Sequence, residues 1–320
     1  MTIKTHFSSA RILVTGGTGL IGSHLVEELL KHDVKIVVPF RHTRKKSYLF
    51  TQHLDRKITL EKVDITNKKK LSQLVSSYKV DYIFHLAAQT TVVNAFLNPY
   101  HTLKNNILGT VHILEAAKQH KHVRGVIVAS SDKAYGKTKK AYTEESPLKG
   151  DHPYDVSKSS ADLITQMYFK TYNLPVVVTR FGNVYGEGDL NFDRIIPGIC
   201  RAIITNKALD IRSDGTYVRD YLYVKDVARG YVTLLHNIDQ IHGEAFNFSS
   251  KETFSVLELI EKVEYILGIN VSHAIQNSAH NEIPFQHLDD KKIRKLGWKN
   301  NNDLNSAIKK ILQWYSAIVR

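Results

Sequence analysis

Short, nearly continuous runs of apolar residues alternate with amphipathic stretches through the first half of the chain. The runs are rich in Val and Ile, which is typical of strands buried on both faces. We expect strands at Arg11–Thr15, Val34–Val38, Ile58–Val63, Tyr82–Leu86, Gly125–Ala129 and Val176–Thr179. Helical periodicity fills the intervals, notably at Gly22–Leu30, Leu71–Tyr78, Tyr100–His120 and Tyr154–Tyr172. This alternation predicts an α/β fold with a doubly wound parallel sheet that helices cover on both faces.

After about residue 185 the pattern changes, because glycines and prolines separate shorter elements. Helices are expected near 193–204, 255–267 and 305–315, and strands near 209–212 and 217–224. No internal repeat or low-complexity linker separates the two halves of the sequence. We expect a first domain at 1–182, which also receives residues from about 225–250, and a smaller lobe made mainly of residues 183–320.

The charge balance is the most unusual feature of the composition. The 320 residues include 44 Lys and Arg against 31 Asp and Glu, a formal net charge of +13. Nucleic acid, a membrane surface and phosphorylated small molecules all attract a basic protein. The whole excess lies in residues 41–70 and 118–140, and neither segment matches a known nucleic-acid-binding module. We therefore expect solvated surface segments here, and no nucleic-acid partner.

The sequence excludes several other classes of protein. Cys200 is the only cysteine, so a secreted scaffold held by internal disulfides is excluded. The N-terminal residues show no apolar segment ahead of a cleavage site, and no run reaches the roughly 18 residues that span a bilayer. His120 and His122 would lie on different sides of a helix without matching ligands nearby. We expect a cytoplasmic protein with no membrane partner and no metal.

A glycine-rich turn, TGGTGLIG, follows the first strand and contains Gly16, Gly19 and Gly22. Glycine permits a tight turn and lets the backbone approach a pyrophosphate closely. The helix that follows begins near Leu20 and Ile21, and its N-terminal N–H groups can bind the same phosphates. A glycine turn between strand and helix, at the start of a βαβ unit, predicts a Rossmann-type dinucleotide site.

The end of the second strand bears on the choice between NAD and NADP. An acidic residue there would bind the ribose of NAD, but the sequence has Arg41 and Arg44 instead. Two guanidinium groups suit a 2′-phosphate, which slightly favours NADP, and a surface-loop role is the alternative for both arginines. Asp64 and Ile65, after the next strand, are placed to meet the adenine ring. We therefore expect an NAD(P) cofactor.

Tyr154 and Lys158 form a Y-x-x-x-K pair, which lies on one face of a helix, one turn apart. A lysine ammonium at that position would lower the tyrosine pKa, so that the phenolate can act as a base near neutral pH. The spacing alone is common. Its combination with the glycine turn and with the SSDK run at 130–133, at the end of a strand, indicates a catalytic site.

From about residue 10 to residue 318 the chain resembles the extended short-chain dehydrogenase/reductase family. Beside the glycine turn, the resemblance rests on HLAA at 85–88, NILGT at 106–110, SSDKAYG at 130–136, YDVSK at 154–158, RFGNVYG at 180–186, VRDYLYVKDV at 218–227 and LGW at 296–298. This combination is specific to nucleotide-sugar epimerases and dehydratases. The resemblance implies that the first domain binds the dinucleotide and the smaller lobe binds a nucleotide sugar.

The resemblance also implies a catalytic triad of Ser131, Tyr154 and Lys158. Tyr154 would take the proton of the sugar C4 hydroxyl while a hydride leaves C4 for the nicotinamide, and Ser131 would bond the same oxygen. Further cofactor contacts are implied for Leu86, Ala87 and Ala88. The cofactor would end the cycle as it began, so we expect it to be tightly bound.

Asp132 and Lys133 bear on which reaction follows C4 oxidation. In the 4-epimerases of the family the position of Asp132 is small and uncharged, whereas in 4,6-dehydratases an acid there protonates the departing C6 hydroxyl. The resemblance therefore favours a dehydratase of the CDP-glucose 4,6-dehydratase type, which makes a 4-keto-6-deoxy sugar nucleotide. Lys133 stands where thymidine-diphosphate-glucose dehydratases have a Glu that removes the C5 proton, and it could serve only when partly uncharged. A 4-epimerase and a catalytically silent NAD(P)-binding regulatory protein remain the alternatives.

Five residues are expected to hold the substrate. Gln89 and Thr90 would line the hexose site, and Asn183, Arg194 and Arg219 would bind the diphosphate. Structural ion pairing is the alternative for the two arginines. The helices at 100–120 and 154–172 correspond to the dimer interface of the family, so a homodimer is expected. Apolar residues on the second helix would permit it, namely Leu163, Ile164, Tyr168 and Phe169.

Overall fold

The computed structural model describes residues 6–138, 140–250, 252–278 and 285–319. The elements of the first half are β1 (Ala10–Thr15), α1 (Leu20–Leu29), β2 (Val34–Phe40), α2 (Tyr48–Thr51), β3 (Thr59–Lys62), α3 (Lys68–Ser77), β4 (Tyr82–His85), α4 (Val92–Leu97), α5 (Pro99–Leu103), α6 (Gly109–Gln119), β5 (Gly125–Ala129), α7 (Pro153–Tyr172) and β6 (Val176–Phe181). Those of the second half are β7 (Asn183–Tyr185), α8 (Ile195–Thr205), β8 (Leu209–Ile211), β9 (Val218–Tyr223), α9 (Val224–His236), β10 (Ala245–Phe248), β11 (Thr253–Phe254), α10 (Val256–Leu267), β12 (His273–Ile275), β13 (Phe285–Gln286), α11 (Lys291–Lys295) and α12 (Leu304–Ile318).

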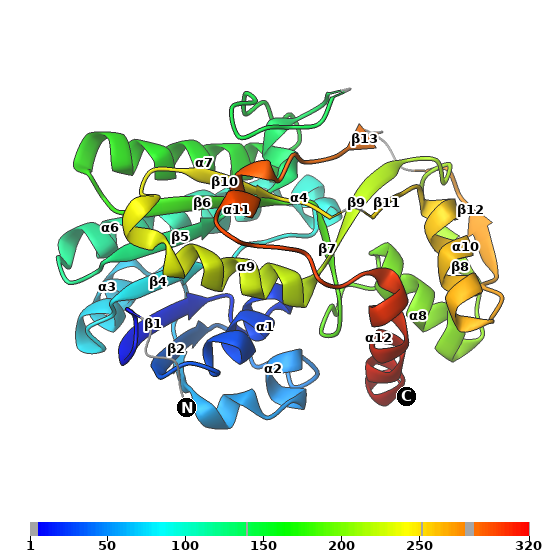
Figure 1. The fold of residues 1–320 in the computed structure, drawn as a ribbon, viewed down its shortest axis with the longest axis horizontal. Helices are drawn as coiled ribbons and strands as arrows, with labels where there is room; N and C mark the ends of the chain where they lie inside the picture. The colour runs from blue at the N-terminus through cyan, green and yellow to red at the C-terminus, as the bar shows by residue number, and fades with distance from the viewer. Residues whose placement is uncertain (1–5, 139, 251, 279–284, 320) are drawn as a thin grey trace.

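A seven-stranded sheet forms the centre of the molecule, in the order β10-β6-β5-β4-β1-β2-β3 (Figure 1). Every neighbouring pair in it is parallel. The strand order reverses between β1 and β4, and in open α/β sheets ligands bind at the carboxyl ends of the strands at such a point. The predicted fold class, a Rossmann-type doubly wound parallel sheet, is confirmed.

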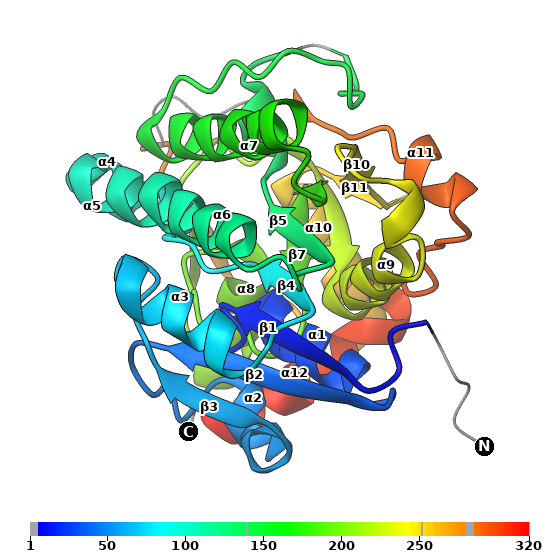
Figure 2. The same cartoon turned by 90° about the vertical axis from the view of Figure 1, so that its left-hand side faces the viewer.

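Helices cover both faces of this sheet. Figure 2 shows α3, α6 and α7 on one face and α1 and α9 on the other. Side chains of β1 alternate between the two layers: Ile12 and Val14 pack in the core beneath α1 and α9, and Leu13 packs in the core beneath α3 and α6. Burial on both faces explains why the strands read as continuous apolar runs.

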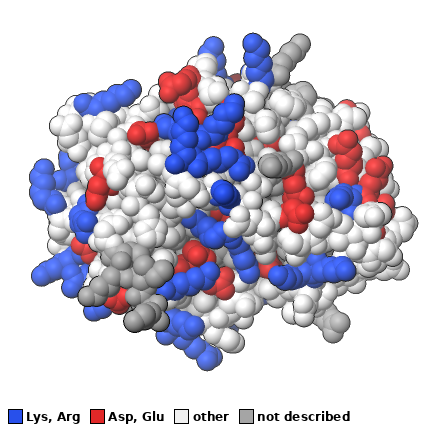
Figure 3. All heavy atoms as spheres, in the orientation of Figure 1, with Lys and Arg blue, Asp and Glu red and all other residues white. Residues whose placement is uncertain are grey.

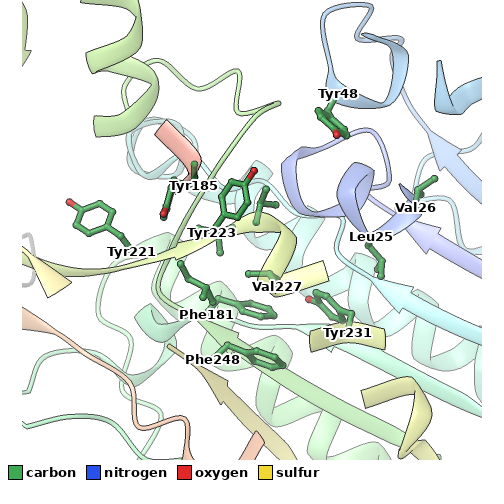
Figure 4. Close-up of a cluster of buried hydrophobic side chains, with 14 of the residues drawn as sticks. Leu25, Val26, Tyr48, Phe181, Tyr185, Tyr221, Tyr223, Val227, Tyr231 and Phe248 are labelled. Carbon is green, nitrogen blue, oxygen red and sulfur yellow. The ribbon is translucent and has the colours of Figure 1, made fainter. Parts of the chain in front are cut away.

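The second lobe is built around β9, which pairs with β7, β11 and β13, and around the two-stranded sheet of β8 and β12. An aromatic-rich cluster joins it to the central sheet (Figure 4). The cluster includes Leu25 and Val26 of α1, Phe181, Tyr185, Tyr221 and Tyr223, Val227 and Tyr231 of α9, and Phe248 of β10. The division at residues 182 and 183 stays a prediction.

Several elements differ from those expected. The single helix expected at Tyr100–His120 consists of α5, a π-helical turn at Lys104–Leu108, and α6. The short strand β10 and the helix α4 were missed, since four to six residues carry too little periodicity to be recognised. Of the four apolar residues expected at an interface on α7, Leu163 is 53% exposed, whereas Tyr168 is buried and Ile164 and Phe169 pack against the core.

The surface does not carry one large basic field on the face shown in Figure 3, where Lys and Arg are interspersed with Asp and Glu. Lys139, in the second basic segment, lies outside the described residues. Among the helices of the described ranges, none has the length and apolar character that a bilayer crossing requires.

An ion pair is buried beneath the catalytic side of the sheet. Arg180, on β6, donates from Nε and Nη2 to the two carboxylate oxygens of Asp162, on α7, at 2.8 and 3.0 Å. Both side chains are almost fully buried, at 2% and 0% exposure. The guanidinium also donates from Nη1 to the hydroxyl of Tyr135, at 2.7 Å, and to the carbonyl of Glu144, at 3.0 Å. One side chain therefore links β6, α7 and the two segments that follow β5.

Replacing Arg180 with Met should lower the free energy of unfolding by about 3–5 kcal/mol, because it leaves the Asp162 carboxylate buried without its guanidinium. The measurement is denaturant unfolding followed by circular dichroism. Lys291→Met is the matched control, since Lys291 forms an exposed pair with Asp289 and its loss should change stability little. Equal stability of Arg180→Met and the control would contradict the structural role given to the buried pair.

Candidate active site

The glycine turn lies at the carboxyl end of β1. Gly16 has φ +73°, and a Cβ there would lie 2.7 Å from the backbone nitrogen of Ala87. A Cβ on Gly22 would collide with the carbonyl oxygen of Gly16, so the turn is closed by direct backbone packing. Helix α1 begins at Leu20 without a side-chain cap, and its first N–H groups remain available to a ligand. The turn therefore fits a pyrophosphate at a helix N-terminus.

A buried histidine fixes the segment opposite the turn. His85 hydrogen-bonds through Nδ1 to the hydroxyl of Thr15, at 2.8 Å, and through Nε2 to that of Thr110, at 3.2 Å. The same Thr15 hydroxyl accepts from the backbone of Ala87, at 3.2 Å. Burial, with the nearby charge of Lys158, lowers the pKa of His85 to about 3, so the ring is neutral. These bonds hold residues 85–88 against the glycine turn.

A pocket of about 200 Å³ lies past the ends of β2 and β3. It is lined by Phe40, Arg41, Lys62, Val63, Asp64, Asn67 and Lys70. Arg41 lies 3.8 Å from the Asp64 carboxylate and donates to Asn105 at 3.3 Å. Burial opposes ionisation of Asp64, but hydrogen bonds from Thr66 and the charge of Arg41 outweigh it and lower the carboxyl pKa. Arg44 is exposed on the loop after β2.

The other residue predicted at the adenine, Ile65, packs against α6. A Cβ on Gly109 would lie 2.6 Å from the Ile65 Cδ1, and the Ile65 carbonyl bonds to His112 at 3.0 Å. Ile65 therefore packs between the edge of the pocket and α6. Arg41 forms part of the pocket wall.

Three predicted catalytic residues lie at the end of β5. Ser131 caps the 3₁₀ turn Asp132–Tyr135, because its hydroxyl accepts from the Lys133 backbone at 3.2 Å. The Ser131 hydroxyl donates to the Asp132 carboxylate at 2.9 Å, and both side chains are buried. Lys133 is half-buried and donates from Nζ to the side-chain oxygen of Gln286 at 3.0 Å. Hydroxyl, carboxyl and amine thus share one short turn.

Tyr154 and Lys158 face this turn from α7. Burial raises the pKa of Tyr154 to about 12, although a hydrogen bond with Ser131 opposes the shift. Lys158 donates to the carbonyl of Ala129 at 2.9 Å, and burial lowers its pKa to about 8. Desolvation of the phenol therefore outweighs the charge of Arg194, and the predicted lowering of the Tyr154 pKa by Lys158 stays a prediction. Ser131, Tyr154 and Lys158 are nevertheless brought together, as expected.

Gln89 is hydrogen-bonded within the chain, and its predicted role at the hexose stays a prediction. Its side chain donates to the carbonyl of Thr91 at 3.0 Å and accepts from Thr102 at 3.4 Å. Asn106, on the π-helical turn, bonds the Gln89 backbone at 2.8 and 3.0 Å and donates to Ser157 of α7 at 2.9 Å. Asn106 therefore links Gln89, which follows β4, to α7. Thr90, the next residue, is exposed.

The three residues predicted at the diphosphate come from different parts of the second lobe. Asn183 opens β7 and is half-buried. Arg194 precedes α8 and donates to Asp189 at 2.9 Å. It therefore forms an ion pair within the chain, which was the alternative to a role at the diphosphate. Arg219 is buried on β9, with its guanidinium 5.6 Å from the centre of the Tyr217 ring. Arg194 lies close enough to Tyr154 for its charge to oppose the rise in the pKa of the phenol.

Four residues of the site were not assigned by sequence. His85, Asn106 and Asp155 stand inside recognised motifs, but nothing in one sequence distinguishes them from their neighbours. Burial raises the pKa of Asp155 to about 6, and the charges of Lys133 and Asp132 both act on it. Gln286, on β13, has no sequence signal at all. In the part of the chain that the structure describes, no group of three or more His, Cys, Asp or Glu could hold a metal ion.

Comparisons with known proteins agree with this geometry. Residues 12–249 match the NAD dependent epimerase/dehydratase family. The chain is 32% identical to the trifunctional UDP-glucose 4,6-dehydratase/UDP-4-keto-6-deoxy-D-glucose 3,5-epimerase/UDP-4-keto-L-rhamnose-reductase of Arabidopsis thaliana, over 98% of this chain and 48% of that protein. It therefore spans about half the length of this relative.

Two solved structures share the fold across nearly the whole chain. One is the UDP-glucose 4-epimerase of Thermotoga maritima with UDP-glucose, with a TM-score of 0.89, 26% identity and coverage of 97% of this chain and all of that one. The other is the dTDP-glucose 4,6-dehydratase of Bacillus anthracis in complex with NAD, with a TM-score of 0.86, 27% identity and coverage of 97% of each chain. The match across most of the chain, together with the glycine turn and the Ser131, Tyr154 and Lys158 cluster, shows that the chain belongs to the NAD dependent epimerase/dehydratase family.

Proposed function

We propose that the protein is a nucleotide-sugar 4,6-dehydratase, which converts an NDP-hexose to the NDP-4-keto-6-deoxyhexose. The observation that carries this proposal is the buried carboxyl of Asp132, bonded to Ser131 at 2.9 Å beside Tyr154. An acid at this point can protonate a C6 hydroxyl, a step that epimerisation at C4 does not need. Relatives named as UDP-glucose and dTDP-glucose 4,6-dehydratases support the assignment, and CDP-glucose stays the predicted substrate.

The cofactor of this reaction is NAD(P). The residues that would hold it are Gly16, Gly19, Leu20, Ile21 and Gly22 of the turn, Leu86, Ala87 and Ala88 opposite it, Asp64 and Ile65 near the adenine, and Tyr154 and Lys158 at the nicotinamide end. When bound, the nicotinamide accepts a hydride and returns it. Arg41 and Arg44 are the basis of the predicted preference for NADP, whereas the solved dehydratase of Bacillus anthracis is recorded with NAD.

The first step removes hydrogen from C4. The Tyr154 oxygen takes the proton of the C4 hydroxyl while the C4 hydride departs, which leaves a ketone at C4. Ser131 bonds to Tyr154 and so can hold the same sugar oxygen. The nicotinamide cation and Lys158 would both favour the phenolate, which is required because burial alone raises the pKa of Tyr154 to about 12.

The second step eliminates water across C5 and C6. The ketone acidifies the C5 hydrogen, and Lys133 takes that proton with its side-chain amine. Asp132 gives its proton to the C6 hydroxyl, the C6–O bond breaks, and a double bond forms between C5 and C6. The hydride then returns to C6, Lys133 returns its proton to C5, and the proton that Tyr154 took from the C4 hydroxyl passes to Asp132 through Ser131, which bonds to both. One water leaves, and the cofactor regains its original state.

The second lobe would bind the nucleotide diphosphate. Arg219 and Arg194 would bring guanidinium groups to the site, and Asn183 opens β7, where it pairs with Tyr221 of the strand that carries Arg219. Arg194 would exchange its bond with Asp189 for the phosphate, or would share it. These groups favour a diphosphate.

A homodimer is part of the proposal. Helix α7 exposes Val156, Leu163 and Met167, and Tyr100 and Leu108 are exposed on the segment that leads into α6. Exposed apolar side chains on adjoining helices are suited to a self-complementary interface.

A 4-epimerase remains the second candidate, because the structure superimposes on the Thermotoga maritima UDP-glucose 4-epimerase with a TM-score of 0.89. Both reactions begin with C4 oxidation, and they differ in the fate of the C6 hydroxyl. The catalytically silent regulatory alternative has no support from the site, where Ser131, Tyr154 and Lys158 are all present.

The protein is incubated with CDP-, UDP- or dTDP-glucose, each together with NAD or NADP. At least one combination of substrate and cofactor should give a product that is lighter than the substrate by one water. Mass spectrometry detects the loss, and the 4-keto product absorbs in alkali. A change of hexose without loss of water would establish the epimerase instead, and the absence of any turnover would favour the regulatory alternative.

Asp132→Asn should slow elimination by at least about 100-fold, because the amide cannot donate the proton that the C6 hydroxyl needs. C4 oxidation should persist, so reduced cofactor accumulates during a single turnover and is seen by its absorbance. Asp210→Asn, an exposed acid of the second lobe, is the control. Turnover of Asp132→Asn at the wild-type rate would reject the role of Asp132.

Gly22→Ala should weaken cofactor binding by roughly tenfold or more, a loss of at least about 1.4 kcal/mol, since the added methyl meets the Gly16 carbonyl. Gly19→Ala should have a smaller effect, because its Cβ meets that oxygen at 3.2 Å. Calorimetric titration with NAD and NADP gives both affinities, and thermal melting checks the fold. The opposite order of effects would contradict the turn as the pyrophosphate site.

A further inference from the structure

Gln286 is fixed at the active site by the second lobe. Its strand, β13, pairs with β9 so that Gln286 lies beside Arg219. The next residues are held as well: His287 bonds to the Asp220 carboxylate at 2.6 Å, and its carbonyl accepts from Tyr142 at 2.9 Å. Gln286 itself is 1% exposed. Its amide therefore has a defined position between the predicted diphosphate site and the 3₁₀ turn of Asp132 and Lys133.

Of the two polar atoms of this amide, one has a hydrogen-bond partner and the other has none among the described residues. The Oε1 atom accepts from Lys133 Nζ at 3.0 Å, whereas Nε2 is buried and has no hydrogen-bond partner among the described residues. Lys133 Nζ donates in this bond, so the amide oxygen is the atom that faces it. A buried donor without a partner is costly and rare in native structures. The unpaired N–H therefore indicates a missing acceptor.

We propose that Gln286 binds a hydroxyl of the hexose through Nε2 and positions Lys133 through Oε1. The inference rests on the proposed dehydratase function. In that reaction C1 carries the diphosphate. Tyr154 and Ser131 bind the C4 oxygen, and Asp132 donates a proton to the C6 hydroxyl. The hydroxyls left for Gln286 are those on C2 and C3. One amide thereby couples recognition of the sugar to the placement of the amine that removes the C5 proton.

Gln286→Leu removes both hydrogen bonds at nearly constant volume. It should weaken binding of the nucleotide hexose by roughly tenfold and leave binding of the nucleoside diphosphate alone unchanged. Calorimetric titration of CDP-, UDP- and dTDP-glucose and of the matching diphosphates measures both. Gln276→Leu is the control, since Gln276 is exposed and bonds Asp210 on the far side of the second lobe. Equal losses for hexose and bare diphosphate would show that the amide binds phosphate and would overturn the hexose assignment.

Analogues that lack the C2 or the C3 hydroxyl identify the partner. The wild type should bind one of them roughly tenfold more weakly than the parent, and Gln286→Leu should bind that analogue and the parent equally. For both analogues, the loss of affinity caused by Gln286→Leu could instead add to the loss caused by the missing hydroxyl. That result would overturn the proposal. Failure of the wild type to turn over any nucleotide hexose contradicts the proposed function, whereas wild-type affinity in Gln286→Leu contradicts this inference alone.

The positioning of Lys133 has its own readout. With a substrate deuterated at C5, Gln286→Leu should lower kcat and raise the isotope effect on kcat, because removal of the C5 proton becomes slower. A purely structural role would change thermal stability and would leave the isotope effect at the wild-type value, and that result would overturn the positioning role. Thermal melting of the variant provides the comparison.

Discussion

The buried ion pair of Arg180 and Asp162 is the constraint on which the arrangement of the site depends. Asp162 lies on the same face of α7 as Tyr154 and Lys158, at successive intervals of four residues, so its bond to β6 sets the position of the catalytic face. Arg180 also holds Tyr135, at the end of the turn that begins with Asp132. A single guanidinium thus orients both the turn of Asp132 and the face of α7 that carries Tyr154 and Lys158. Because the pair is buried, breaking it would leave an uncompensated charge in the interior.

From Tyr135 the same network reaches the second lobe. The Tyr135 hydroxyl donates to Asn247 on β10 at 2.7 Å, and Asn247 donates to the carbonyl of Tyr142 at 3.0 Å. Tyr142 pairs in turn with the segment that carries Gln286 and Leu288. A continuous set of buried hydrogen bonds therefore joins the turn of Asp132 to the segment of Gln286, and parts of the chain that are distant in sequence are fixed to the same frame.

Much of the first domain could be predicted from sequence, because strands buried on both faces and a glycine turn leave strong local patterns. The cluster of Ser131, Tyr154 and Lys158 was also found, since motif spacing determines which side of a helix a residue occupies. Gln286 could not be found, because its role depends on the pairing of β13 with β9, a contact that no local pattern encodes. The effect of burial on the pKa of Tyr154 could not be predicted, since the extent of burial is a property of the folded chain.

The central claim is that oxidation at C4 is followed by loss of the C6 hydroxyl, with Asp132 as the acid. A nucleotide glucose with deuterium on C4 tests it most directly, by following that atom through one turnover with magnetic resonance and mass spectrometry of the product. The account predicts that the deuterium appears in the C6 methyl group of a 4-keto product that has lost one water. Deuterium that remains on C4 of an intact hexose would contradict it, because the hydride would then have returned to the carbon it left.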